Sequence, residues 1–222
     1  MHSEGAAFGS GPVVIRDNLL RDGWSFAPER PGLHVAWSGT MGDTLWEPHP
    51  RTWAAPGWAR LEAAVTRAAP MFHAAGATLA LRTHARHVLG DPHSALRFAQ
   101  WLNASGGVGG AVMVLADPIG WLTPGMIEAA EEHLERIFDG VLTLHATGRL
   151  AGVVLTNLEA TAAVGRDAID DGAPMARGPV HAGAITPEWI ARGVRRMPAD
   201  MAVFLEGGAE EAQQQWLAAL VD

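Results

Sequence analysis

Residues 78–84 have the sequence TLALRTH, and residues 111–117 have AVMVLAD; in both, a short apolar run ends in charged or polar side chains. Similar short runs lie at residues 13–15, 33–37, 141–144, 152–155 and 201–205. Consecutive apolar positions in runs this short are typical of parallel strands that are covered on both faces. The sequence therefore predicts a parallel sheet whose strands end in polar groups.

Longer amphipathic stretches separate these runs, and three of them carry helix-start signals. Asp91-Pro92, Thr123-Pro124 and Thr186-Pro187 each place a capping side chain before a proline at the first helical position. Further helices are expected at residues 57–76 and 209–221, and Pro70 should kink or break the first of these. Strands that alternate with helices of this length predict βαβ units and an α/β fold.

The number of strands favours a partial barrel. GGVGG at residues 106–110 precedes a predicted strand instead of following one, which disfavours a dinucleotide-binding fold. Six or seven strands in 222 residues are fewer than a complete TIM barrel has, with its eight strands and about 250 residues. We expect a (β/α) TIM-type barrel that is incomplete or degenerate at its N-terminal end, unless another strand lies within the first 60 residues.

The domain organisation predicted from the sequence is simple. Residues 1–12 are expected to form a flexible leader, and residues 13–222 a single domain. An incomplete barrel exposes sheet edges, which proteins normally cover. We expect the first 30 residues or a second copy in a homodimer to cover such an edge.

Composition excludes several function classes. The chain contains no cysteine, lysine or tyrosine, so disulfides, thiolate or Schiff-base catalysis and P-loop chemistry are excluded. Its net charge of −8 and the lack of a basic cluster beyond Arg195-Arg196 argue against nucleic acid as a partner. No apolar run approaches the roughly 18 residues of a membrane span, and the N-terminus lacks a signal peptide pattern. A cytoplasmic protein with no membrane partner is expected.

The residues that could carry chemistry follow the apolar runs, where parallel strands of a barrel converge on one face. Five candidates follow a run: Arg82, His84, Asp117, His145 and Glu206. A sixth, His181, follows the short segment 178–180. Two carboxylates and two or three imidazoles converging there could hold a divalent ion such as Mg²⁺, Mn²⁺ or Zn²⁺.

Each candidate also has a structural interpretation. Asp117 could cap a helix, His145 could be a core histidine, and Glu206 could be solvated. Arg82 and Arg86 could bind a phosphate or carboxylate, or form ion pairs with the two acids.

Four tryptophans gather near the run at 33–37. Trp37, Trp46, Trp53 and Trp58 could pack in the core, or form an aromatic wall against a sugar or another ligand.

The order of these run ends resembles the sugar phosphate isomerase/epimerase superfamily, the xylose isomerase-like TIM barrels related in fold to AP endonuclease family 2. The resemblance covers residues 32–206. In LALRTH, His84 matches the family pattern, but Arg82 stands where a metal-binding Glu is expected. In VLADPIGW, Asp117 and its proline match, and the family's following His is missing. LTLHATGR keeps His145 without the usual acid, and VFLEGG supplies Glu206 as the last metal-binding Glu.

The resemblance implies proton transfer next to a carbonyl of a sugar or polyol, assisted by a divalent metal. Asp117, His145 and Glu206 would be the metal ligands, with Glu206 and Asp117 as the catalytic groups. Arg82, His84, His181 and Trp37 would contact the substrate, a sugar or an anionic metabolite. Arg82 would place a positive charge where the metal ion is expected, and this charge should weaken metal binding. The alternative is a non-catalytic relative that binds a small anionic ligand or a protein partner through the same face.

Overall fold

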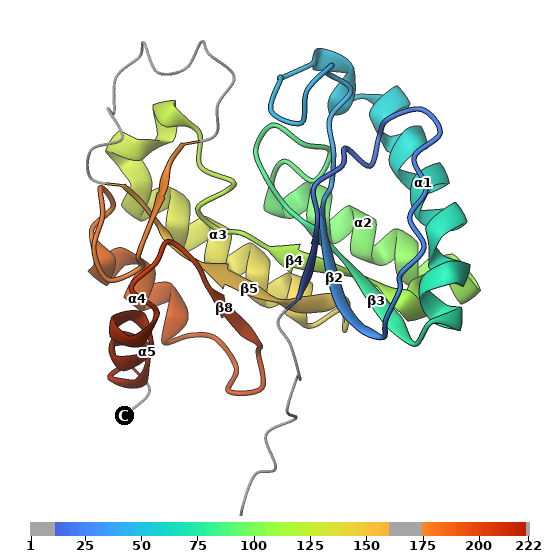
Figure 1. Ribbon diagram of the computed structural model, residues 1–222. Coiled ribbons are helices and arrows are strands. Elements are labelled where there is room, and N and C mark those ends of the chain that lie inside the picture. Colours follow the sequence, from blue (N-terminus) through green and yellow to red (C-terminus); the bar gives the residue numbers. More distant parts are fainter. Residues whose placement is uncertain (1–11, 160–174, 221–222) are drawn as a thin grey trace, which may run out of the picture.

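The computed structural model describes residues 12–159 and 175–220, without the side chains of residues 107–109. Its main feature is a six-stranded, wholly parallel sheet in the order β1-β2-β3-β4-β5-β8 (Figure 1). The strands are β1 Val13–Ile15, β2 Gly32–Trp37, β3 Ala77–Arg82, β4 Val112–Ala116, β5 Leu150–Leu155 and β8 Val203–Leu205. The predicted parallel pairing is confirmed.

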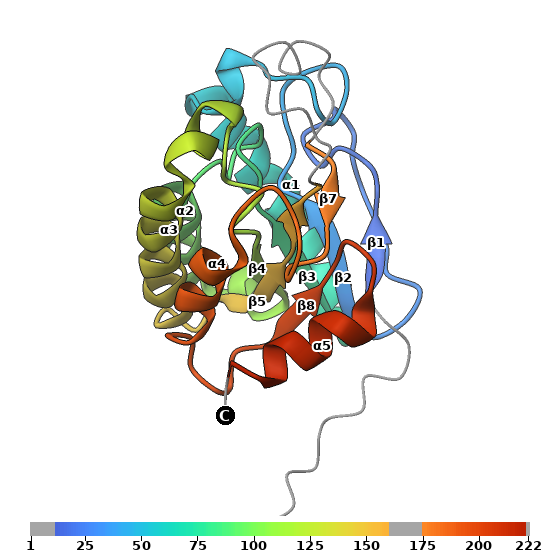
Figure 2. The ribbon, with the colours of Figure 1, turned by 90° about the vertical axis from the view of Figure 1, so that its left-hand side faces the viewer.

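Helices connect the strands. They are α1 Ala55–Ala74, α2 Pro92–Ala104, α3 Ala130–His145, α4 Pro187–Val194 and α5 Glu210–Ala218, with short 3-10 turns at Pro50–Thr52, Gly106–Ala111 and Pro124–Ala129. Asp91 caps α2 as predicted, since its carboxylate accepts from the Ser94 backbone N–H at 2.7 Å. Figure 2 shows α2, α3 and α4 on one side of the sheet.

The sheet is part of a barrel wall. Its strands follow one another in chain order with helices in between, and β1 and β8 form its two edges in the described part of the chain. The fold is therefore an α/β half-barrel, an incomplete (β/α) barrel of the TIM type, as the sequence predicts. The expected leader at residues 1–12 lies almost entirely outside the described residues.

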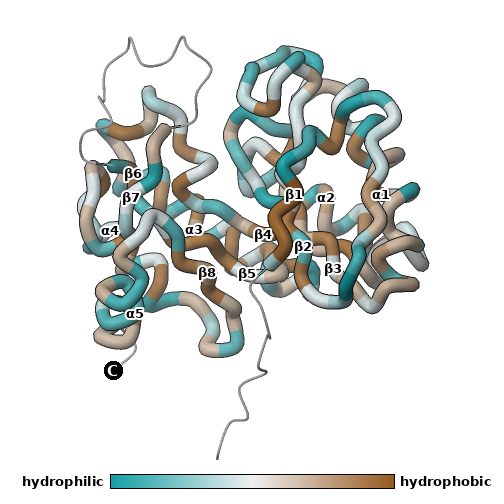
Figure 3. The backbone as a smooth tube through the Cα atoms, viewed as in Figure 1, coloured by the Kyte–Doolittle hydropathy of each residue, from teal (hydrophilic) through white to brown (hydrophobic). Residues whose placement is uncertain are grey.

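Two apolar clusters lie on the two faces of this wall. The large one packs the sheet against the helices, and Figure 3 shows hydrophobic residues along the strands of the sheet, among them β1, β4, β5 and β8. The small one contains Val35, Ala80, Leu115 and Val154 on the other face. Adjacent residues such as Ala36, Leu81 and Val114 belong to the large cluster, because successive strand side chains point to opposite faces.

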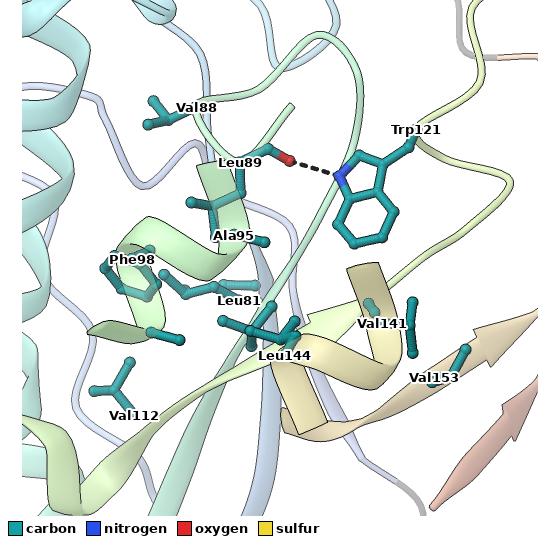
Figure 4. Packing of buried hydrophobic residues seen from close by; sticks show 14 of the residues in the cluster. Leu81, Val88, Leu89, Ala95, Phe98, Val112, Trp121, Val141, Leu144 and Val153 are labelled. Carbon is teal, nitrogen blue, oxygen red and sulfur yellow. Dashed lines mark hydrogen bonds between the residues drawn. The ribbon is translucent and has the colours of Figure 1, made fainter. Parts of the chain in front are cut away.

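One predicted strand is wrong. Residues 141–144 lie in the last turn of α3, in which buried Leu134, Phe138, Val141 and Leu144 recur at helical spacing. Figure 4 shows Val141 and Leu144 on the side of the helix that faces Val153 of β5. The sheet still has six strands, because each of the other six predicted runs, including the one at 13–15, contains a strand.

Pro70 lies within α1, which continues to Ala74, so the predicted break does not occur. Outside the main sheet, β6 Asn157–Leu158 pairs with β7 Arg177–Gly178 as a short antiparallel ribbon. Residues 160–174 between them lie outside the described residues. None of the helices within the described ranges is long and apolar enough to cross a membrane.

Candidate functional site

The carboxyl ends of three strands carry the charged residues of the candidate site. Arg82 is the last residue of β3, Asp117 follows β4, and Glu206 follows β8. Parallel strands end at the same edge of a sheet, so all three side chains start from one rim of the half-barrel.

Arg82 joins the two acids directly. Its Nε and Nη2 donate to Asp117 Oδ2 at 3.0 and 2.6 Å. Its Nη1 and Nη2 donate to Glu206 Oε1 and Oε2 at 2.6 and 2.8 Å. The guanidinium therefore lies between the two carboxylates that the resemblance assigns to a metal ion.

The contact between Arg82 and Glu206 depends on the curl of the sheet. β3 and β8 are separated by β4 and β5, so three strand spacings, about 14 Å, would lie between them in a flat sheet. In a concave sheet the same side chains reach each other across the inside. The half-barrel shape thus brings these charges to one place.

Asp117 is the buried centre of this charge cluster, with a side chain that is 0% exposed. Besides Arg82, the Gly120 backbone N–H donates to its Oδ1 at 2.7 Å, and Arg177 Nη2 lies 3.3 Å from its Oδ2. Burial would raise the pKa of Asp117, but the charges of Arg177 and Arg82 outweigh burial and hold this pKa below its ordinary value. Asp117 is therefore ionised.

Arg177 reaches the cluster from β7, outside the main sheet. A Cβ on Gly207 would lie 2.1 Å from the Gly178 carbonyl oxygen, so the chain after Glu206 passes directly against the residue that follows Arg177. Sequence reasoning missed Arg177, because a two-residue ribbon at the end of a long loop has no periodic pattern to mark it.

An aromatic group borders the charges. The register of β2 and β3 places Trp37 beside Arg82, whose guanidinium lies 4.4 Å from the centre of the Trp37 ring. The rings of Trp37, Trp46, His84 and His87 all contact one another, with centroid distances of 4.9 to 5.7 Å. Trp46, one of the four tryptophans noted in the sequence, comes from the loop after β2, and His87, which the sequence did not single out, comes from the loop after β3.

Both imidazoles of this group are neutral. Burial, followed by the charges of His87 and Arg177, lowers the pKa of His84 well below its ordinary value. Its Nδ1 accepts from the Arg86 backbone N–H at 3.2 Å, so Nε2 carries the proton. Burial lowers the pKa of His87 to about 4, although the hydrogen bond to the Leu45 carbonyl opposes this shift.

The low pKa of His87 predicts acid sensitivity. Its pKa of about 4 lies below the unfolded value of about 6.5, so its contribution to stability is complete above pH 6.5 and is lost as the pH falls towards 4. The full loss is roughly 3 kcal/mol. Urea unfolding at pH 7.5 and 4.5 measures it. His87→Gln should flatten this decrease, exposed His93→Gln should not, and equal decreases in both variants would contradict the assignment.

Two predicted site residues do not join this cluster in the described structure. His145 is the last residue of α3, and its Nε2 lies 3.7 Å from Asp200 Oδ1. Both residues precede the starts of strands, β5 and β8, whereas Asp117 and Glu206 follow strand ends. His181 lies in the turn after β7, and the side-chain hydrogen bonds and ion pairs of Arg82 and Asp117 within the described residues do not include it. Substrate-binding roles for Trp37, His84 and His181 stay predictions.

The donor set does not fit the divalent ion that the resemblance implies. Arg82 Nη2 is within 2.8 Å of an oxygen of each carboxylate, so a cationic group already fills the space between them. His145, the third expected ligand, lies beside Asp200 and not beside these two carboxylates. The part of the chain described here contains no group of three histidine, aspartate or glutamate residues that could hold a metal ion.

Comparisons with known proteins give a likeness in structure only. No protein-family model and no curated protein matches the sequence. The chain is similar to the crystal structure of the probable 3-DHS dehydratase AsbF, which is involved in petrobactin synthesis, from Bacillus anthracis. The TM-score is 0.49 at 14% sequence identity, over 85% of this chain and 61% of that one. The chain therefore spans less than two thirds of the length of that protein.

Proposed function

We propose that this protein binds a small anionic metabolite at the carboxyl ends of its half-barrel strands, with arginine in place of a metal ion. The observation that carries the proposal is the position of the Arg82 guanidinium between Asp117 and Glu206. A guanidinium is a permanent cation with several donors in a fixed plane, which suits anionic ligands. The predicted divalent metal has no part in this proposal, because the donor set does not fit it.

The charge balance supports an anionic ligand. Arg82 and Arg177 balance the two carboxylates of Asp117 and Glu206, and Arg86, whose charge acts on the neighbouring imidazoles of His84 and His87, adds one positive charge. The site thus carries a local surplus of positive charge, although the whole chain has a net charge of −8. An anion that enters the site would therefore meet attraction here, whereas the chain as a whole repels it.

A sugar or polyol isomerase or epimerase is the second candidate. The neutral imidazole of His84 favours it, because its protonated Nε2 can donate to a carbonyl oxygen. Glu206, once released from Arg82, would take the proton from the neighbouring carbon. Exchange of that carbon-bound hydrogen in D₂O, followed by NMR over a panel of sugars and sugar phosphates, distinguishes this activity from binding alone.

The anion site is tested by thermal unfolding in EDTA. The panel contains phosphate, sulfate, sugar phosphates and small carboxylates at constant ionic strength. At least one class should stabilise the protein saturably, by about 2.7 kcal/mol at a hundred times its Kd.

The controls are two arginine-to-lysine changes. Arg82→Lys keeps the charge but loses the planar fork, and should remove the stabilisation. Arg97→Lys should not, although Arg97 also stacks on a tryptophan, 4.2 Å from the Trp58 ring. A panel without any saturable response would refute the proposal.

A further inference from the structure

We infer that the ligand group recognised at this site is a planar carboxylate, and that Glu206 occupies its place until the ligand displaces it. This inference rests on the proposed anion site and specifies its chemistry. It concerns only the outer edge of Arg82, formed by Nη1 and Nη2, because the Nε edge is bound to Asp117.

The outer edge of Arg82 has the geometry of a carboxylate receptor. Its two nitrogens hold Oε1 and Oε2 of Glu206 at 2.6 and 2.8 Å, which is the paired N–H···O arrangement of arginine with carboxylate. The ring of Trp37 lies against the face of the guanidinium and limits its rotation. A tetrahedral phosphate would bring a third oxygen and a second negative charge to an edge that offers this one pair of donors.

Of the two carboxylates, Glu206 is the one that can leave. Its side chain is 43% exposed and has Arg82 as its partner, whereas the side chain of Asp117 is 0% exposed. Asp117 also accepts from Gly120 and contacts Arg177, and these contacts keep it in place.

Displacement of Glu206 needs no rearrangement of the sheet. The Glu206 backbone N–H donates to the Leu155 carbonyl at 3.2 Å, which ties this residue to the end of β5. Rotation of the half-exposed side chain towards solvent is therefore sufficient to uncover the two Arg82 nitrogens. The incoming carboxylate would form the same pair of hydrogen bonds that Glu206 gives up.

Removing the Glu206 side chain tests this inference. Glu206→Ala leaves the outer edge of Arg82 open, so acetate or formate should raise its Tm saturably by roughly 3 °C over chloride at equal ionic strength. The carboxylate should bind at least tenfold more tightly to this variant than to the wild type. Glu206→Gln, which keeps the volume of the side chain, should show a smaller response.

Glu188→Ala is the matched control. Glu188 also faces an arginine through both carboxylate oxygens, at 2.7 and 3.5 Å from Arg195, but it lies on α4 away from the site. An equal acetate response in this control would overturn the inference. Stabilisation of Glu206→Ala by phosphate or sulfate in preference to acetate would also overturn it, and would leave the proposed anion site standing. No response of Glu206→Ala to any anion would refute both.

Discussion

Replacing Arg82 with methionine is expected to lower the free energy of unfolding by about 3 kcal/mol, mainly through Asp117. The Asp117 side chain is 0% exposed and that of Arg82 is 9% exposed, so the variant leaves a buried carboxylate without its closest cation. Arg177 Nη2 remains 3.3 Å from Asp117 and limits the loss. Urea unfolding at pH 7.5 measures the change. Glu206 gains exposure to water and should add little.

A double-mutant cycle assigns the cause of this loss. Asp117→Asn removes the buried charge, so the double variant Arg82→Met with Asp117→Asn should lose less than the sum of the single losses, by more than about 1 kcal/mol. Additive losses would mean that Arg82 stabilises the fold through packing on Trp37 instead of through Asp117.

Replacing Gly207 with alanine is expected to lower the free energy of unfolding by about 3 kcal/mol or more, through steric overlap and backbone strain. The new Cβ would lie 2.1 Å from the Gly178 carbonyl oxygen and 2.2 Å from its carbon, and Gly207 has a φ of +93°. Since Gly178 follows Arg177 and Gly207 follows Glu206, the change should also weaken anion binding. Urea unfolding and the anion panel measure the two effects.

Gly208 is the matched control for this substitution. Its φ is +79°, but a Cβ there would have no atom within 4 Å. Gly208→Ala should therefore cost only the left-handed backbone strain, about 1–2 kcal/mol. Equal losses in the two variants would show that the close approach between the residues after Glu206 and Arg177 does not exist.

The sequence predicts the meeting of Arg82, Asp117 and Glu206 for a physical reason. Each follows an apolar run of four to six residues, and runs covered on both faces pair in parallel with their ends at one edge. Local composition is sufficient to find such strands. The direct contact between Arg82 and Glu206 depends on the curl of the whole sheet, and no local sequence pattern predicts that curl.

His145 shows where this reasoning fails. The run at 141–144 is apolar at consecutive positions and resembles a strand in isolation. In the longer window of α3, its buried residues follow Leu134 and Phe138 at helical spacing. Residues 141–144 are therefore helical. His145, which follows them, lies where strands of the sheet begin, at the opposite end from Asp117 and Glu206.

Arg177 and His87 could not have been found from periodicity. They come from a short ribbon and from a loop, and tertiary contacts alone bring them to Asp117 or Trp37. In retrospect, the approach of Gly207 to Gly178 positions Arg177, but a glycine pair in a sequence does not indicate which backbone it will meet.

We propose above that Arg82 replaces a metal ion in the binding of an anion. This proposal is tested most directly by calorimetric titration of the wild-type protein with the anion that stabilises it most, once in EDTA and once in excess Mn²⁺. Because Arg82 and no metal ion would hold the anion, we expect the same Kd in both buffers. Binding that requires Mn²⁺ would contradict the proposal.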